Sequence, residues 1–226
     1  MKIYHASGTV GDTYVILCKL YRIAAWERIL CNHYVAYKEL RPVIREIYAL
    51  LPNIELSFKD IETPVVELSG AFRFPGQEAE QGKYNLNPEY YPEFEPGNID
   101  RFNLPQAYET LQVKAGSHGE RSLYAETIVR ILAESNLPVI LIGENSESLS
   151  AEDFNVIDLR GKSSVKETIS IIKESERFHG PLGFLSFVAV SQRVMSNVYM
   201  RSQLDISAIS FRTEAVEEWR RFLIRR

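Results

Sequence analysis

A short apolar strand, a glycine-containing turn and the start of a helix follow one another in the first thirteen residues, and this order constrains the fold most. Residues 1–5 are typical of a strand, and Ser7-Gly8-Thr9-Val10-Gly11-Asp12-Thr13 leads directly into a helical pattern. Glycines let a backbone approach a ligand closely, and the unpaired amides of a first helical turn favour negative charge. The corner is therefore expected to bind an anion. Asp12 either caps this helix or takes part in chemistry, and spacing leaves both open.

The remainder of the first half alternates strands and helices. Residues 28–35 and 54–58 are expected strands, and residues 65–68 are a further candidate. A helix over 37–51 is predicted by apolar residues at spacings of three and four, namely Leu40, Val43, Ile44, Ile47 and Leu51. The connections are too long for hairpins, so the alternation favours a parallel sheet flanked by helices.

The character of the sequence changes between residues 69 and 105, where glycine and proline interrupt a segment dense in aromatic and acidic residues. Its rings are Tyr84, Tyr90, Tyr91, Phe94 and Phe102. Such apolar surface is costly to leave in water, so residues 82–102 are expected to form an ordered irregular segment that packs along the cleft or the domain junction. A loop pinned by its rings and a recognition loop both remain open.

The second half repeats the alternation. Strands are expected at 110–113, 139–142, 155–159 and 194–200. A helix is expected over 121–134, with Ala125, Ile128, Val129 and Leu132 on one face. Ser164 and Glu167 form a capping box ahead of another helix, and an amphipathic helix from Thr213 closes the chain with Trp219 facing inward.

The predicted fold class is therefore α/β, with two small Rossmann-like domains, parallel sheets and a cleft between the domains. Residues 1–104 form the first domain, which includes the irregular aromatic segment 70–104, and residues 105–226 form the second, which includes the closing helix. Trp26 and Trp219 are expected to anchor the core or the domain interface.

Composition argues against several classes of partner, although a local basic groove stays compatible with it. The chain has 226 residues with 26 basic and 30 acidic side chains, so no broad cationic footprint for nucleic acid is expected. Cys18 and Cys31 lie in apolar segments and are expected to be buried free thiols of a reducing compartment. No apolar run approaches the roughly 20 residues that span a bilayer. A cytoplasmic protein without a transmembrane segment is expected, and peripheral membrane contact stays compatible with it.

Candidate binding loops follow the predicted strands, since ligands bind outside the carboxyl ends of parallel strands. These loops are residues 7–12, 114–118, 143–146, 160–162 and 180–183. Glycine beside polar side chains suits a phosphate-bearing ligand that Lys114, Arg160 or Lys162 neutralises, although such glycines also simply turn a chain. Of the four histidines, His5, His33, His118 and His179, only His118 lies in such a loop. No histidine or cysteine pair has metal-ligand spacing, so no metal site is expected.

The sequence resembles the glycosyltransferases related to the ADP-heptose lipopolysaccharide heptosyltransferases in several short segments, which follow one another in the same order as in that family. The pair Gly11-Asp12 matches the "GD" that begins the first helix of this family. From Leu111, "LQVKAGSHGERSLYAETIVRILAESNLPVILIGE" is similar to the family's strand, glycine loop, helix and second strand. From Asn155, "NVIDLRGKSSVKETISIIKESERFHGPLGFLSFVAV" is similar to the segment that leads into its donor-binding loop.

The resemblance implies a GT-B fold, with the acceptor site in the first half and a nucleoside-diphosphate sugar in the second. It implies a glycan or other hydroxyl acceptor, and neither a cofactor nor an obligatory metal. Asp12 would be the general base. Thr9, Gly11 and Thr13 would lie on the acceptor side. The donor and its phosphates would contact Lys114, Gly116, Ser117, Arg121, Gly143, Glu144, Gly183 and Ser186.

Three positions depart from the family pattern. Leu182 stands where a phosphate-binding hydroxyl is usual, Ser186 where a histidine is usual and Glu120 where a lysine is usual. The sequence therefore leaves two functions open. One is a glycosyltransferase, and the other is a catalytically inactive GT-B-like protein that binds a nucleotide, a glycan or a protein partner.

Overall fold

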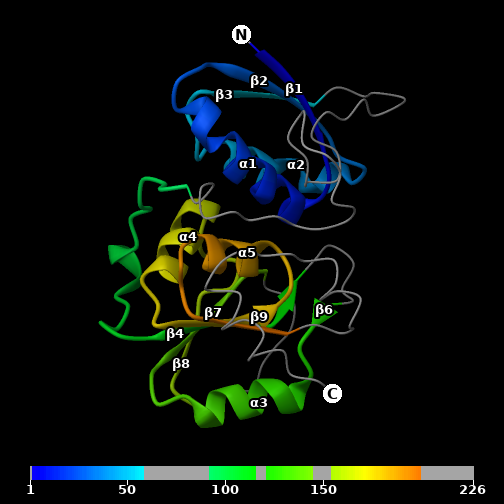
Figure 1. The fold of residues 1–226 in the computed structure, drawn as a ribbon. Coiled ribbons are helices and arrows are strands. Elements are labelled where there is room, and N and C mark those ends of the chain that lie inside the picture. Colours follow the sequence, from blue (N-terminus) through cyan, green and yellow to red (C-terminus); the bar gives the residue numbers. More distant parts are fainter. Residues whose placement is uncertain (1, 59–91, 116–120, 145–153, 200–226) are drawn as a thin grey trace. The chain divides into compact units, whose positions relative to one another are not determined.

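A computed structural model describes residues 2–58, 92–115, 121–144 and 154–199 of the chain (Figure 1). Several expectations lie outside these residues: the strand at 65–68, most of the aromatic segment, residues 116–120 and the closing helix with Trp219. The described residues form two compact units that divide between Glu95 and Pro96. Each unit is considered by itself below.

The first unit is a parallel sheet covered on one face by two helices (Figure 1). Its elements are β1 (Lys2–Ser7), α1 (Val10–Ala24), β2 (Ile29–Tyr34), the 3-10 turn η1 (Lys38–Leu40), α2 (Arg41–Tyr48) and β3 (Ile54–Ser57). The strands lie in the order β1-β2-β3, and both neighbouring pairs are parallel. The predicted α/β class with a parallel sheet is confirmed for this unit.

Helix α2 shows how the local sequence shapes the unit. The apolar spacing predicted one helix over 37–51, whereas the structure has η1 first and α2 from Arg41. Pro42 lies in the first turn of α2, where its missing amide hydrogen is tolerated. Ile44 and Ile47 are fully buried, as the spacing predicted.

The second unit contains a larger parallel sheet and a small ribbon. Its elements are η3 (Asp100–Phe102), β4 (Glu109–Gln112), β5 (Lys114–Ala115), β6 (Arg121–Ser122), α3 (Ala125–Glu134), β7 (Val139–Ile142), β8 (Val156–Asp158), α4 (Val165–Lys173), β9 (Arg177–Pro181), α5 (Phe184–Ser191) and β10 (Ser196–Tyr199). The five strands of the large sheet lie in the order β10-β9-β4-β7-β8, and every pair is parallel. If the five strands are numbered in chain order and read from the β8 edge, this is the Rossmann order 3-2-1-4-5. Its switch point lies between β4 and β9.

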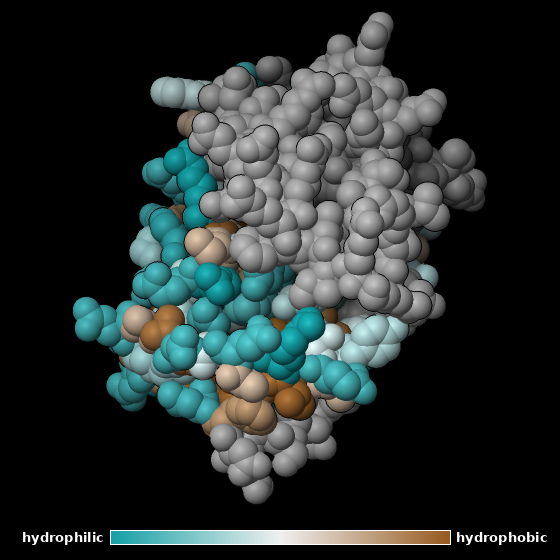
Figure 2. Space-filling model, turned by 60° about the horizontal axis from the view of Figure 1, so that its bottom comes forward, coloured by the Kyte–Doolittle hydropathy of each residue, from teal (hydrophilic) through white to brown (hydrophobic). Residues whose placement is uncertain are grey.

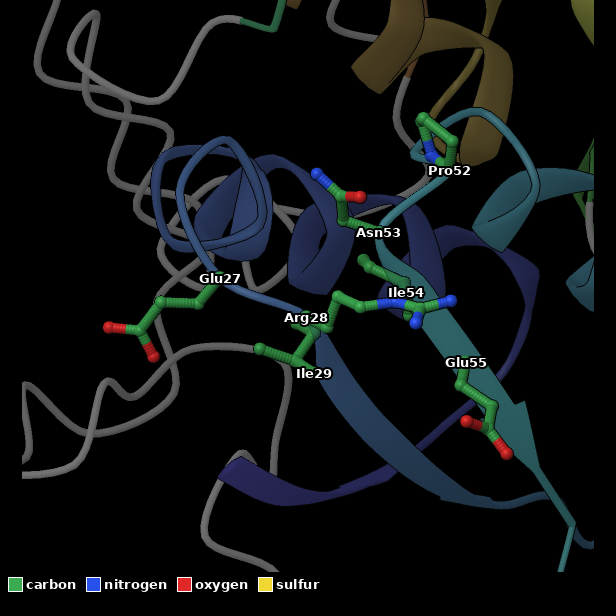
Figure 3. Close-up of a pocket in the computed structure, with 7 residues that line it drawn as sticks. All are labelled: Glu27, Arg28, Ile29, Pro52, Asn53, Ile54 and Glu55. Carbon is green, nitrogen blue, oxygen red and sulfur yellow. The ribbon is translucent and has the colours of Figure 1, made fainter. Parts of the chain in front are cut away.

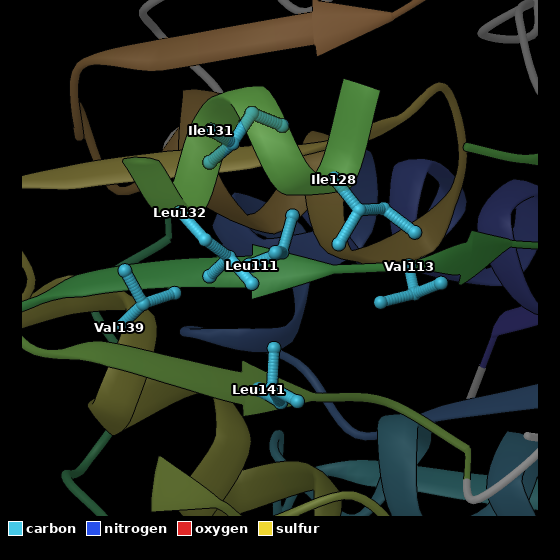
Figure 4. Packing of buried hydrophobic residues seen from close by; sticks show 7 residues of the cluster. All are labelled: Leu111, Val113, Ile128, Ile131, Leu132, Val139 and Leu141. Atoms are coloured by element: carbon cyan, nitrogen blue, oxygen red, sulfur yellow. The ribbon is translucent and has the colours of Figure 1, made fainter. Parts of the chain in front are cut away.

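Helices cover both faces of this sheet, α3 on one side and α4 with α5 on the other (Figure 1). Beneath α3, a cluster of branched apolar side chains forms the core (Figure 4). Its buried members are Leu111, Val113, Ile128, Ile131, Leu132, Val139 and Leu141. Successive side chains of a strand point to opposite faces of the sheet. The strand residues next to those of the cluster therefore face α4 and α5.

Segment 96–104, which the sequence assigned to the first domain, belongs to the second unit. The Gly97 amide donates to Ser170 Oγ at 2.7 Å, and a Cβ on Gly97 would lie 2.8 Å from the Glu167 backbone. Arg101 Nε donates to Glu167 Oε1 at 2.8 Å. Before this segment, Phe94 is buried in the first unit, with its ring centroid 6.1 Å from that of Tyr14.

Two packing expectations are wrong. The helix predicted from residue 121 begins at Ala125, because Arg121–Ser122 pairs antiparallel with Lys114–Ala115. The inward face of α3 carries Ile128, Ile131 and Leu132, whereas Ala125 and Val129, which were expected there, are exposed, Val129 to 52%. Trp26 is not a core residue, since 89% of its surface is exposed.

The described surface visible in Figure 2 is mostly hydrophilic, and its apolar side chains appear in small separate groups. Such groups are normal for a folded chain. Of the helices described in the structure, none is both long and apolar enough to cross a membrane.

Candidate active site

Asp12 lies in the first turn of α1, at the carboxyl edge of β1. Its Oδ2 accepts hydrogen bonds from the Thr9 amide at 2.8 Å and from the Thr9 hydroxyl at 3.1 Å. The amide and hydroxyl of Thr13 both donate to the Thr9 carbonyl oxygen, at 2.9 and 2.8 Å. Thr9 is thus the N-cap of α1, and Asp12 closes the cap from three residues further on. The capping role left open by the sequence is present, and it fixes the orientation of the carboxylate.

Gly8 is the residue that lets Asp12 take this position. Gly8 has a φ of +140°, and a Cβ there would lie 2.6 Å from Asp12 Oδ2 and would overlap Asp12 Cβ. Only glycine meets both conditions without strain. The close backbone approach expected at this turn is therefore made by a carboxylate of the protein itself.

A buried chain of polar groups runs behind the turn. His33 Nε2 lies 3.3 Å from the Gly8 carbonyl oxygen, and His33 Nδ1 lies 3.0 Å from the Tyr48 hydroxyl. The Cys31 thiol donates to the same hydroxyl at 3.2 Å. Burial lowers the pKa of His33 to about 4, although the Gly8 bond and the charge of Asp12 act in the opposite direction. The imidazole is therefore neutral at pH 7.

Sequence reasoning treated His33 as a packed or exposed imidazole and missed this chain. A signal was present, because Cys31 and His33 are two residues apart on a strand and must share a face. Tyr48 ends α2, and its side chain is 1% exposed. Polar side chains that are buried between a strand and a helix need hydrogen-bonding partners, and the Tyr48 hydroxyl is the partner of both Cys31 and His33.

In the second unit, the carboxyl ends of β4, β7 and β9 lie together at the switch point of the sheet. A Cβ on Gly183 would lie 2.8 Å from Ala115 Cβ, and one on Gly143 would lie 3.6 Å from Gln112 Cγ. Gln112 Nε2 donates to the Lys114 carbonyl oxygen at 2.8 Å. Three predicted donor-side residues, Lys114, Gly143 and Gly183, are thus gathered in one region.

Other predicted donor-side groups are engaged within the protein. Ser186 is fully buried, and its hydroxyl donates to the Gly183 carbonyl at 2.8 Å and accepts from the Gly183 amide at 2.9 Å. This turn caps α5. Arg160 is 5% exposed and pairs with Asp158 through bonds of 2.9 and 2.7 Å, which lowers the pKa of Asp158. The Lys162 ammonium donates to the Asp158 carbonyl at 2.6 Å.

Of the remaining predicted donor-side residues, Gly116 and Ser117 lie outside the described residues. Arg121 is in β6, and Glu144 is exposed after β7. On the acceptor side, Thr9, Gly11 and Thr13 surround Asp12 at the start of α1. No group of three or more histidine, cysteine or acidic side chains that could hold a metal ion occurs among residues 2–58, 92–115, 121–144 and 154–199.

A hollow of about 820 Å³ lies at the amino ends of the strands of the first sheet, where β2 and β3 begin (Figure 3). Figure 3 shows Arg28 reaching toward β3 and Glu27 pointing the other way. The Asn53 amide group donates to the Ala24 carbonyl at 2.8 Å, and the Ile29 amide donates to the Asn53 carbonyl at 3.0 Å. The first of these bonds joins the start of β3 to the end of α1. Parallel sheets bind ligands outside the carboxyl ends of their strands, which lie on the side away from this hollow. The candidate site is therefore at the Asp12 edge.

No protein-family model matches the sequence, and no curated protein matches it significantly. Solved structures do match. The glycosyl transferase family 9 protein of Veillonella parvula is similar with a TM-score of 0.61 at 9% identity, over 97% of this chain and 90% of that chain. The E. coli ADP-heptose lps heptosyltransferase II is similar with a TM-score of 0.53 at 10% identity, over 93% and 90%.

A third match is TibC, an iron-containing dodecameric heptosyltransferase of enterotoxigenic E. coli, solved in complex with ADP-D-beta-D-heptose. The TM-score is 0.53 at 13% identity, over 94% of this chain. The chain spans 59% and 62% of the lengths of the two TibC chains it matches. At such identities the likeness concerns the fold. The fold expected from the sequence resemblance is confirmed: this chain has the GT-B-type α/β fold of these glycosyltransferase structures, at 9% and 10% sequence identity.

Proposed function

We propose that this chain transfers a sugar from a nucleoside-diphosphate sugar to an acceptor hydroxyl, with Asp12 as the general base. The observation that carries the proposal is the fixed carboxylate of Asp12 at the carboxyl edge of β1, in a chain with a glycosyltransferase fold. The donor class is supported by TibC, which was solved with ADP-heptose.

The chemistry requires a base at the acceptor. As the acceptor oxygen attacks the anomeric carbon, its proton passes to the Asp12 carboxylate, and the bond from that carbon to the diphosphate breaks. The diphosphate leaves with the electron pair. A base must lie within about 2.6 to 3.2 Å of the proton-bearing oxygen, and a carboxylate held by two bonds from Thr9 is pre-oriented for this. The amino end of α1 favours the negative charge of Asp12 before the transfer.

The second unit supplies the features that suit a departing diphosphate. Its Rossmann strand order has its switch point between β4 and β9, and sheets of this kind bind ligands outside the carboxyl ends of the strands at such a point. Gly183 precedes the first turn of α5 there, and Lys114 follows β4. Backbone amides at a helix start and a nearby cation stabilise the charge that develops on a leaving phosphate.

A thermal-shift screen with ADP, GDP, UDP, CDP and their sugars tests donor binding. A ligand that binds only the native state raises its melting temperature by mass action. We expect one nucleotide class to raise the melting temperature. No shift with any of them would favour the non-catalytic alternative, in which the fold binds a glycan or a protein.

The variant Asp12→Asn tests the base. An amide oxygen still accepts from Thr9, so the cap and donor binding should survive while transfer falls by about 10²- to 10⁴-fold. The matched control is Glu167→Gln, which alters the corresponding cap of α4 and should leave transfer unchanged. Wild-type transfer by the Asp12→Asn protein would remove Asp12 from the mechanism.

A further inference from the structure

The buried chain behind the Asp12 turn has a single possible direction. A carbonyl oxygen only accepts hydrogen bonds, so His33 Nε2 must carry the proton that it donates to Gly8. A neutral imidazole carries one such proton, and Nδ1 is therefore an acceptor. Tyr48 must then donate to Nδ1, and its oxygen accepts from the Cys31 thiol. The bonds all run from Cys31 through Tyr48 and His33 to Gly8.

Strand β2 holds the Gly8 residue from two sides. The Gly8 amide donates to the Tyr34 carbonyl oxygen at 3.3 Å, while its carbonyl oxygen accepts from His33. Both partners belong to β2, whose pairing with β1 is in register from Lys2 to Ser7. The conformation of Gly8 is thereby fixed at the φ of +140° that brings it against Asp12.

Asp12 depends on this fixation because it touches Gly8. Gly8 and Asp12 lie so close together that a Cβ on any other residue at position 8 would overlap Asp12. A rotation of the Gly8 peptide would move the Thr9 amide, which holds Asp12 Oδ2. The geometry of the candidate base therefore depends on a peptide that His33 anchors.

We infer that His33 is a positioning residue for the proposed transfer, which holds the Gly8 carbonyl and so sets the place of the Asp12 carboxylate, while Tyr48 selects the tautomer that can do this. The inference rests on the proposed function for its catalytic meaning. Its structural content stands on the three hydrogen bonds and the buried, neutral state of the imidazole, and it can be tested apart from the catalytic meaning.

The structural content is tested by NMR without any assay of transfer. In the wild type, the His33 ring nitrogens should give the signature of the Nε2–H tautomer. In Tyr48→Phe that preference should weaken, and amide exchange at Thr9 and Thr13 should accelerate by about tenfold, as expected for a lost buried hydrogen bond. The control is Tyr108→Phe, which removes a buried tyrosine hydroxyl that donates to the Ile171 carbonyl at 2.9 Å in the second unit. It should leave Thr9 and Thr13 unchanged.

Transfer assays test the catalytic meaning. His33→Phe should lower kcat by about tenfold with little change in the KM for the donor, because donor binding belongs to the other unit. His33→Gln should restore much of the rate, since its amide nitrogen can reach the place of Nε2 and donate to Gly8. A merely space-filling role would give His33→Gln no advantage, with Phe tolerated at least as well as Gln.

The outcomes separate the two claims. If the wild type shows no transfer but Tyr48→Phe changes the tautomer and the exchange of Thr9, the proposed function fails while the positioning of the turn stands. An Nδ1–H tautomer in the wild type, or unchanged exchange of Thr9 and Thr13 in both Tyr48→Phe and His33→Phe, would overturn the inference. A higher kcat for His33→Gln than for His33→Phe, together with an altered turn in His33→Phe, would support it.

Discussion

The starts of α1 and α4 use the same capping device in two different settings. Thr9 and Asp12 close one, and Ser164 and Glu167 close the other, with the Ser164 amide donating to Glu167 Oε2 at 2.8 Å. Each is backed by a glycine, Gly8 or Gly97, on which a Cβ would clash. Local sequence alone does not distinguish these two helix starts.

What differs is the group behind each carboxylate. Glu167 receives two bonds from Arg101, at 2.8 and 3.0 Å, and this guanidinium holds the pKa of Glu167 at about 2. Asp12 instead lies beside a glycine that a neutral, buried histidine anchors. The Glu167 carboxylate is held by an ion pair to a distant arginine, whereas the Asp12 carboxylate is oriented by the Thr9 amide and hydroxyl beside Gly8. The comparison teaches that the partner contributed from elsewhere in the chain, and not the cap, decides the role.

Gly8→Ala should break the α1 side of the comparison most severely. A positive φ and the overlap with Asp12 together should lower the free energy of unfolding by about 4 kcal/mol. Chemical denaturation measures this loss. Gly11→Ala, within the same helical turn, is the matched control and should be neutral or slightly stabilising, because alanine is the better helix former. Equal stabilities for the two variants would show that Gly8 is not constrained as described.

Acid titration of stability should separate the two sites by pH window. The folded pKa of His33 is about 4, below the ordinary 6.5, so its contribution is complete above pH 6.5 and is lost as the pH falls through 4. That shift corresponds to a loss of about 3 kcal/mol. The groups facing His33 are Asp12, Cys31 and Tyr48, and the Phe58 ring, over which the guanidinium groups of Arg41 and Arg45 lie.

Glu167 should titrate in a lower window. Its pKa is depressed from 4.5 to about 2, so its contribution is present above pH 4.5 and lost between there and pH 2. Unfolding followed by denaturant at a series of pH values distinguishes the two. His33→Gln should flatten the curve between pH 6.5 and 4 and leave the lower window in place. A slope that persists there in His33→Gln would mean that another group carries it.

The smallest effect should come from the α4 side. Glu167→Gln keeps a neutral cap but loses the ion pair to the exposed Arg101, which should cost about 1 kcal/mol at neutral pH. The loss should shrink in high salt, because an exposed pair is screened. Denaturant unfolding at low and high salt measures both losses. A loss of the same size in high salt would show that the ion pair does not carry it.

Much of the fold was predictable because its signals are local. The spacing of Ile44 and Ile47 placed the buried face of α2, and the Ser164–Glu167 pair marked the start of α4. The order of strands and helices predicted parallel sheets, which the register of β1 with β2 bears out. These features depend on residues that are close in the sequence or repeat with a fixed period.

The rest depends on pairings between distant residues. Arg121–Ser122 looked helical, but its pairing with Lys114–Ala115 overrides that propensity. The chain from Cys31 to Gly8 joins two strands and a helix, so no window of sequence contains it. Arg160 and Ser186 carry the right chemistry for phosphate, and only packing shows that Asp158 and the Gly183 backbone engage them.

The buried thiols give the molecule a built-in labelling probe. The chain has two cysteines, Cys18 and Cys31, and both are buried in the first unit. Burial raises the pKa of the Cys31 thiol to about 12, so at neutral pH a thiol reagent should meet an unreactive group until the unit opens. The rate of thiol modification therefore measures the opening of the first unit alone. It needs no engineered residue, and the second unit contributes no thiol to the signal.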